Sequence, residues 1–158
     1  MNGDIYQFFV DRLKNLQDRI VRAVSDGMLA GGGPDTLAAV DSVGADDTIY
    51  RIDKLGEQEI LDYFEKKIQP EVSCVLVAEG IADGRAAFTS SGRAEDAEFI
   101  VIMDPVDGSR GLMHGKRSAW SLAGVAPNHE HSTLRHIRAA VMTEIPAPKQ
   151  TLHDQLCD

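Results

Sequence analysis

The stretch Phe99-Ile-Val-Ile-Met-Asp104-Pro-Val-Asp107-Gly-Ser-Arg-Gly111 decides the fold, because an apolar run leads directly into two aspartates. The run predicts a buried strand over residues 99–103. Pro105 lacks an amide hydrogen and should stop ladder pairing, and Gly108 allows the backbone to come close to a ligand. The strand would therefore present both aspartates at its exit, in a form suited to a hard cation such as Mg²⁺. Asp-Pro and Asp-Gly are also common turn formers, and this alternative stays open for the motif alone.

Other acidic residues follow the same pattern upstream. Glu79 comes directly after the apolar run 75–78, so it is a second carboxylate at the exit of a predicted strand. Asp47 and Asp53 flank the entry to a predicted helix, and Glu57 lies one turn further on. Asp53 could simply cap that helix and Glu57 could lie on its solvated face, so neither is specific by itself.

The order of the predicted elements indicates an α+β fold. Apolar residues recur every three or four positions from Ile5 to Met28, which predicts an amphipathic helix that ends before Gly31. A second helix is expected over roughly residues 54–69, capped by Asp53 and stopped by Pro70. Strands are predicted over 72–78, 99–103, 118–125 and 137–142, and the segment 80–98 suits an exposed hairpin or a mobile connection. Two helices would thus pack on a mainly antiparallel sheet.

Composition narrows the class of protein. A chain of 158 residues with 43% hydrophobic content suits one domain over residues 1–158. A net charge of -9 disfavours a nucleic-acid partner and suits divalent cations. The sequence has two cysteines, no apolar run of membrane-spanning length and no basic, then apolar start. We therefore expect a cytoplasmic protein without a membrane or nucleic-acid partner.

Three motifs together resemble the inositol monophosphatase-like superfamily, which includes fructose-1,6-bisphosphatases. Asp104-Pro-Val-Asp107-Gly-Ser109 matches its Asp-Pro-x-Asp-Gly-Thr/Ser signature. Asp47-Thr-Ile-Tyr-Arg-Ile-Asp53-Lys-Leu-Gly-Glu57 is similar to its Asp-x-x-Thr/Ser-x-x-Asp-x-x-x-Glu element, and Val77-Ala-Glu79-Gly to its strand-end Gly-Glu-Glu. The resemblance runs from the first helix to about Thr143. It implies the first half of a layered αβαβα sugar-phosphatase fold.

The resemblance also implies a role for each matching residue. Glu79, Asp104 and the Val106 carbonyl would hold a first metal ion, and Asp104 and Asp107 would contribute to a second. Asp47 and the Ser109 hydroxyl would orient the attacking water, and the amides of Gly108 and Ser109 would hold phosphate oxygens. The implied cofactor is Mg²⁺, two or three ions per site. The implied reaction is hydrolysis of a small phosphorylated metabolite, an inositol, sugar or nucleotide phosphate, by metal-activated water.

Three departures from the family pattern bear on activity. Tyr50 stands where the family has Thr or Ser, and Gly80 replaces the second glutamate of the strand-end motif. The family's C-terminal half, with its Trp-Asp-x-x-x-Gly segment, has no counterpart in the chain, so the second metal would lack a ligand. The alternative to an enzyme is a truncated, catalytically incomplete metal-binding or assembly module. A homo-oligomer or a C-terminal partner chain would cover apolar strands that the missing half leaves open.

Several further side chains were weighed as ligands. The five histidines do not show metal-site spacing, since His129 and His131 are two apart in a Pro- and Ser-containing loop. We expect solvated loop histidines. Lys116 and Arg117 could contact a substrate phosphate near the site mouth, although plain surface charge is the alternative. Trp120 is expected in the core.

Overall fold

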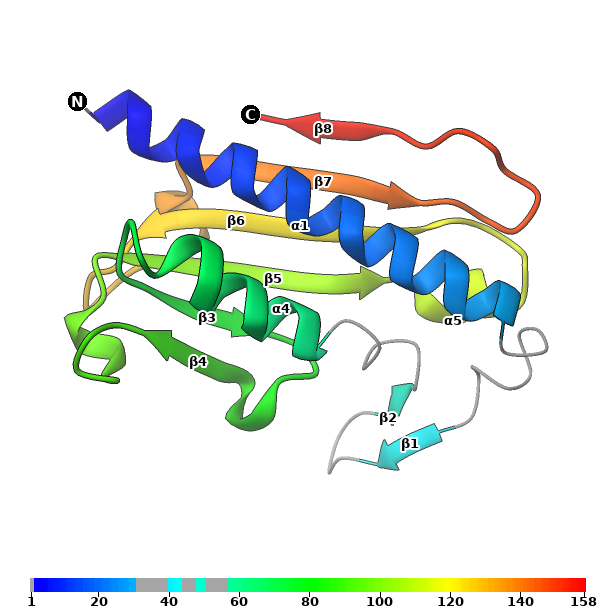
Figure 1. Cartoon of the computed structure of the whole chain (residues 1–158), viewed down its shortest axis with the longest axis horizontal. Coiled ribbons are helices and arrows are strands. Elements are labelled where there is room, and N and C mark those ends of the chain that lie inside the picture. Colours follow the sequence, from blue (N-terminus) through cyan, green and yellow to red (C-terminus); the bar gives the residue numbers. More distant parts are fainter. Residues whose placement is uncertain (1, 31–39, 44–47, 51–56) are drawn as a thin grey trace.

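The main element of the fold is a six-stranded sheet with the strand order β4-β3-β5-β6-β7-β8 (Figure 1). The computed structural model describes residues 2–30, 40–43, 48–50 and 57–158. β3 is parallel to β5, and every other neighbouring pair in this sheet is antiparallel. The strands are β3 (Cys74–Ala78), β4 (Arg85–Phe88), β5 (Phe99–Asp107), β6 (Ala119–Pro127), β7 (Ala139–Ile145) and β8 (Gln155–Cys157). With helices packed on this sheet, the expected α+β class is confirmed.

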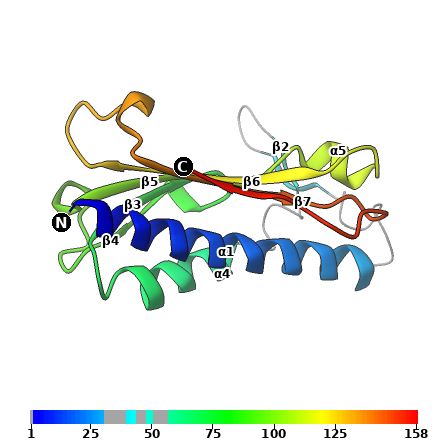
Figure 2. The same cartoon turned by 90° about the horizontal axis from the view of Figure 1, so that it is seen from above.

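Two helices lie on one face of the sheet (Figure 2). α1 (Asn2–Ala30) confirms the first predicted helix and its end before Gly31. α4 (Glu57–Tyr63) runs into a π-helical turn, η1 (Phe64–Ile68), so the second predicted helix is confirmed where it is described. Its first predicted residues and the proposed cap Asp53 lie outside the described residues. Pro70, which cannot continue a helix, follows directly after Gln69.

The core lies between α1, α4 and this face of the sheet. Fully buried residues of α1 recur at the predicted spacing, namely Phe9, Leu13, Leu16, Ile20 and Val24. α1 packs mainly on β7, whose alternate residues are buried, as the two-residue period of a strand requires. α4 and η1 add Ile60, Phe64 and Ile68, all fully buried. The buried faces of the helices and of the sheet therefore form one hydrophobic core.

A buried polar network joins α1 to the C-terminal strands. Gln17 is fully buried, and its amide nitrogen donates to the Val141 carbonyl at 3.1 Å. The Thr143 hydroxyl donates to the Gln17 Oε1 at 2.7 Å. Gln155 of β8 donates to the Thr143 hydroxyl oxygen and to the Asp18 Oδ1, both at 3.0 Å. Because each buried group has a partner, the network fixes β8 beside α1 without leaving an unpaired amide.

Strand boundaries differ from the sequence predictions in two ways. The strands predicted over 72–78, 118–125 and 137–142 appear as β3, β6 and β7 with small shifts of their ends. The segment 80–98 contains β4, which pairs with β3 as a hairpin, so the hairpin alternative expected for this segment is confirmed. The strands that the sequence did not reveal are short, with β8 spanning three residues and the separate β1 (Val40–Val43) and β2 (Thr48–Tyr50) four and three. Runs this short carry little periodicity.

Within the described ranges, none of the helices has the length and apolarity needed to cross a lipid bilayer.

Candidate metal and phosphate site

The site begins at a bulge near the end of β5. Asp104 is paired with Leu122 of β6, and Asp107 is paired with Trp120, so three steps on β5 match two on β6. Pro105 has no amide hydrogen for the ladder, which accounts for an extra residue at this point. The expectation that the strand stops at 103 is therefore wrong: β5 continues through the bulge to Asp107. The bulge keeps both aspartates on a paired strand.

Parallel pairing places Glu79 beside this strand end. Ala78, the last residue of β3, is paired with Met103 of β5. Glu79 and Asp104 are therefore the next residues of two adjacent strands that run in the same direction. The two residues therefore leave the one parallel pair of this sheet at the same end. Glu79 is exposed and Asp104 is half-buried, so both carboxylates lie at the protein surface, at the ends of these two inner strands.

The Asp104 carboxylate has a charged, partly dehydrated environment. Burial raises the pKa of Asp104 above its usual range, and the negative charge of Glu79 raises it further, with a smaller effect from Asp107. The Val106 amide opposes this shift by donating to the Asp104 Oδ1 at 3.1 Å. Both neighbouring carboxylates are thus close enough to repel Asp104. A bound cation would relieve that repulsion, so these residues fit a hard divalent ion by charge and donor type.

Gly108 turns the chain out of the strand. Its φ of 87° lies in the left-handed region, which glycine adopts without steric cost. The short helix α5 (Ser109–Met113) follows, and the Gly108 carbonyl accepts hydrogen bonds from the amides of Gly111 at 3.0 Å and Leu112 at 3.3 Å. Leu112 is fully buried and anchors this turn. Ser109 is therefore held directly after this turn, two residues beyond Asp107.

The remaining predicted ligands are not all within the described chain. Asp47 and Asp53 lie outside the described residues, and Glu57 is the first residue of α4. Among the residues that the structure describes, no group of three or more His, Cys, Asp or Glu side chains is placed to hold a metal ion. Glu79, Asp104 and Asp107 interact electrostatically but do not by themselves form a closed set of ligands.

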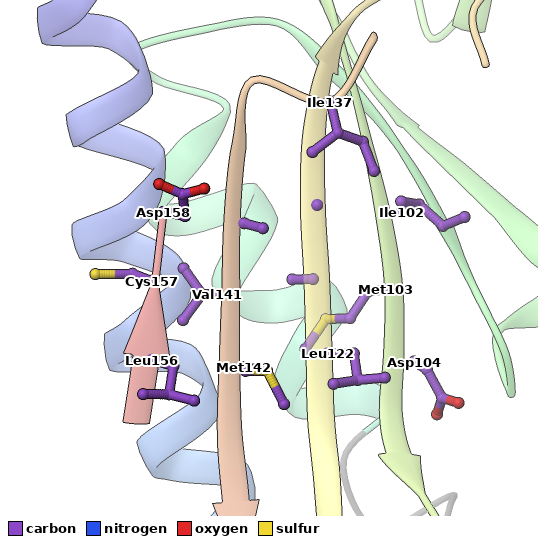
Figure 3. A pocket seen from close by; sticks show the side chains of 13 residues that line it. Ile102, Met103, Asp104, Leu122, Ile137, Val141, Met142, Leu156, Cys157 and Asp158 are labelled. Carbon is purple, nitrogen blue, oxygen red and sulfur yellow. The ribbon is translucent and has the colours of Figure 1, made fainter. Parts of the chain in front are cut away.

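An apolar groove beside Asp104 was not assigned to the site from sequence. It has a volume of about 470 Å³ and runs across the sheet face opposite α1, from Asp104 to Asp158 (Figure 3). Ile102, Leu122, Met142 and Leu156 are among its lining residues. The signal in the sequence was the nearly unbroken apolar run of β6, which is typical of a strand covered on both faces.

Two lesser expectations can be checked here. All five histidines are exposed, as expected for loop residues: His114, His129, His131, His136 and His153. Trp120 is only half-buried and is the strand partner of Asp107, so its assignment to the core was wrong. Its position on β6 places it at the edge of the site, where a ring with one apolar body and one N–H donor can contact both protein and solvent.

Solved structures show the same fold. No protein-family model matches the sequence, and no curated protein matches it significantly. Fructose-1,6-bisphosphatase of Leishmania major in its holo form is 15% identical with a TM-score of 0.62, over 93% of this chain and 46% of that one. The MJ0109 inositol monophosphatase-fructose 1,6-bisphosphatase is 18% identical, with a TM-score of 0.57, over 84% and 45%. The Thermotoga maritima inositol monophosphatase TM1415 is 22% identical, with a TM-score of 0.52, over 94% and 48%.

These likenesses are partial in one respect. The matches cover 84–94% of this chain, yet the chain spans less than half of each of these solved structures. At these identities the shared feature is the fold, and the carboxylate-bearing strand ends lie within it. The resemblance inferred from the sequence is therefore confirmed at the level of the fold: this chain folds like part of the inositol monophosphatase and fructose-1,6-bisphosphatase structures.

Proposed function

We propose that this chain supplies the metal- and phosphate-binding part of a Mg²⁺-dependent phosphatase that hydrolyses a small phosphorylated metabolite, namely an inositol, sugar or nucleotide phosphate. The observation that carries the proposal is the meeting of Glu79 and Asp104 at adjacent parallel strand ends, with Asp107 just beyond the bulge. The fold shared with solved phosphatases supports it.

Each residue has a proposed role in the reaction. Glu79, Asp104 and the Val106 carbonyl would bind one ion, and Asp104 with Asp107 would bind another, so Asp104 would bridge the two. When bound, Mg²⁺ activates water near neutral pH and stabilises the charge that develops on the phosphate and the leaving oxygen. The site would take two or three such ions in all.

The groups after the bulge would handle water and phosphate. The Ser109 hydroxyl, together with Asp47, would orient the attacking water toward phosphorus. The Gly108 and Ser109 amides would donate hydrogen bonds to the phosphate oxygens, which the open backbone conformation of Gly108 permits. Positioning and charge stabilisation would supply the rate enhancement, since the protein forms no covalent bond to phosphorus in this scheme.

The experiment is a phosphate-release screen over inositol, sugar and nucleotide phosphates, with and without Mg²⁺. Asp104→Asn should abolish Mg²⁺-dependent release and weaken Mg²⁺ binding measured by calorimetry. Asp26→Asn is the matched control, because Asp26 is an exposed aspartate on α1, on the opposite face of the sheet. Equal release by the wild-type chain and Asp104→Asn would refute the assignment.

A second candidate is a binding or assembly module that retains cations without catalysis. It is favoured by the open apolar groove and by the absence, among described residues, of a complete metal-ligand cluster. In this case the groove would contact a second copy or a C-terminal partner chain. Mg²⁺ binding without phosphate release, from this chain alone and from a longer version, would support the module. A cytoplasmic location fits both candidates and stays a prediction.

A further inference from the structure

The apolar groove beside Asp104 is formed by two neighbouring rows of side chains on the open face of the sheet. The first row crosses four strands and consists of Asp104, Leu122, Met142 and Leu156, each paired with the next. Directly paired residues of adjacent antiparallel strands have their side chains on the same face. Figure 3 shows these four side chains in line across β5, β6, β7 and β8. One wall of the groove is therefore a ridge of three large apolar side chains that ends at a carboxylate of the proposed metal site.

The second row contains small residues, and they create the hollow. It runs from Ile102 through Gly124 to Ala140, again as paired residues. A Cβ added at Gly124 would lie 2.9 Å from the Ile137 Cδ1 and 3.5 Å from the Ile102 Cγ2. The two isoleucines thus pack over the glycine and border the groove opposite the ridge. Gly124 and Ala140 form the floor between these two borders.

The groove has the size and the chemistry of a small-molecule site. Its volume of about 470 Å³ lies within the range of ligand pockets, roughly 300–1,000 Å³. Among the thirteen described residues that line it, the only charged side chains are those of Asp104 and Asp158, and Cys157 carries a thiol. Asp104 also belongs to the strand end that carries the proposed metal ligands. The groove and the proposed site are therefore continuous through this residue.

The lining of the groove disfavours a polyol. Inositol and sugars carry several hydroxyl groups, and a hydroxyl that leaves water without gaining a hydrogen-bond partner costs free energy. The ridge and the floor present no hydroxyl, amide or charged side chain beyond Asp104. A flat aromatic ring loses no hydrogen bond on such a surface and gains free energy in proportion to the apolar area that it buries. The groove therefore favours an aryl group over a polyol.

We propose that the groove binds the organic part of an aryl phosphate, whose phosphate lies at the Asp104 end. This inference rests on the proposed function and narrows it, because it selects an aromatic phosphate ester over an inositol or sugar phosphate. Leu122, Met142 and Ala140 then determine which organic group is accepted. They act on binding and take no part in the transfer of the phosphate to water.

The test compares 2-naphthyl phosphate with glucose 6-phosphate, which share the phosphate and differ in the organic part. Affinities are measured in Mg²⁺ by NMR shifts of backbone amides, and phosphate release is followed in the same samples. The wild-type chain should bind the naphthyl ester at least about tenfold more tightly, because the ring buries apolar area in the groove. 2-Naphthol, which lacks the phosphate, should shift the same groove amides but bind more weakly than the ester.

Three variants test the groove itself. Ala140→Leu fills the floor and leaves the strand-end carboxylates in place, so it should weaken the naphthyl ester about tenfold and glucose 6-phosphate less than about twofold. Met142→Thr lowers the ridge and should weaken the ester about threefold to fivefold, which keeps the test decisive if the larger leucine disturbs the fold. Ala87→Leu is the matched control, because Ala87 is a half-buried strand alanine on β4, outside the groove, and it should change neither affinity.

The outcomes distinguish this inference from the proposed function. Equal affinities of the wild-type chain for both esters, or equal losses for both in Ala140→Leu, would overturn the aryl site even if Mg²⁺-dependent phosphate release is observed. A selective loss for the naphthyl ester without any phosphate release would keep the aryl site and refute the catalytic proposal.

Two further results would also overturn the inference. Binding of 2-naphthol as tight as that of the ester would separate the groove from the phosphate site. A dimer detected by light scattering in the wild-type chain and lost in Ala140→Leu would assign the groove to a second copy of the chain.

Discussion

The two faces of the six-stranded sheet have very different surroundings. One face is covered by α1 and α4, and the strand residues that point to it are almost fully buried, such as Val101, Val125 and Val141. The other face carries Ile102, which is 41% exposed, and Leu156, which is 55% exposed, around an open groove. The strands are apolar on both sides, but the long helix α1 and α4 cover only one side, whereas the short helix α5 lies on the other. The difference indicates that both faces of the sheet are suited to packing against another protein element.

The polar groups differ between the faces in the same way. On the covered face, Gln17 and Thr143 are satisfied by direct hydrogen bonds to each other and to the backbone. On the open face, Asp104 is repelled by neighbouring carboxylates and has one backbone donor. Stability is concentrated on the first face and the proposed chemistry at the end of the second. The following predictions test this contrast, from the largest expected effect to the smallest.

Truncation of a side chain should cost far more on the covered face. Leu16→Ala removes a fully buried side chain of α1 and is expected to lower the free energy of unfolding by about 3–5 kcal/mol. Ile102→Ala, on the open face, should cost only about 1 kcal/mol, because much of that side chain is already in solvent. Urea denaturation measures both. Equal costs would mean that the open face is covered in solution, which light scattering would detect as a dimer or larger assembly.

Breaking the buried polar network should give the next largest effect. Gln17→Leu removes the donor to the Val141 carbonyl and the acceptor of the Thr143 hydroxyl hydrogen, and is expected to cost about 1–3 kcal/mol. The double variant with Thr143→Val should recover part of this loss, because it removes the hydroxyl hydrogen that is left unpaired, while Gln155 keeps its bonds to Asp18 and to the Lys14 carbonyl. A double-mutant cycle by thermal denaturation gives the coupling, and strictly additive losses would contradict the network.

Ser121→Ala should be neutral or slightly stabilising. Ser121 is fully buried on the covered face of β6, and its hydroxyl is the sole buried side-chain oxygen or nitrogen without a partner among described residues. Alanine removes that unsatisfied group at little cost in volume, for a gain of up to about 1 kcal/mol. A clear loss of stability in chemical denaturation would show that the hydroxyl has a partner in solution, such as a water molecule.

Asp104→Asn should raise the melting temperature of the metal-free chain at neutral pH. The raised pKa of Asp104 means that its ionised form is less favourable in the folded state than in the unfolded state. Asparagine removes this penalty and keeps an oxygen that can accept from the Val106 amide. The advantage should shrink as the pH falls through the raised pKa of Asp104 toward its ordinary value of 3.8, and Mg²⁺ should stabilise the wild-type chain alone. A variant that is less stable than wild type at pH 7 would contradict the proposed repulsion.

Glu144, also on the open side of β7, should show the opposite pH dependence. A hydrogen bond from the Ser118 hydroxyl at 2.6 Å, and further ones from Gln150 and the Asp154 amide, lower the pKa of Glu144. Because the pKa is lowered in the folded state, the ionised Glu144 stabilises the fold at every pH above the usual glutamate pKa of 4.5. This stabilisation is lost as the pH falls through the lower pKa of the folded state. Melting curves of Glu144→Gln and wild type should therefore differ slightly at pH 7 and converge in acid. The effect is small because Glu144 is only half-buried and solvent screens its charge. A difference that grows in acid would contradict it.

The amino-acid sequence alone determined the amphipathic first helix, the main strands and the identity of the motif residues. The helical period of α1 can be recognised in the sequence because one stripe of apolar residues faces the core along the helix. The apolar run ending in Asp104 and Asp107 is readable because a buried strand needs no polar residue before its exit. Local rules suffice for these features, since each depends on neighbours within a few residues.

The tertiary structure alone decided how these pieces meet. Parallel pairing of β3 with β5 brings Glu79 beside Asp104, although 25 residues separate them in sequence. The bulge that carries β5 past Pro105 depends on the partner strand β6, and the three-residue β8 is held by contacts with β7 and α1. Such contacts form between strands that are distant in sequence, so a local sequence pattern does not predict them.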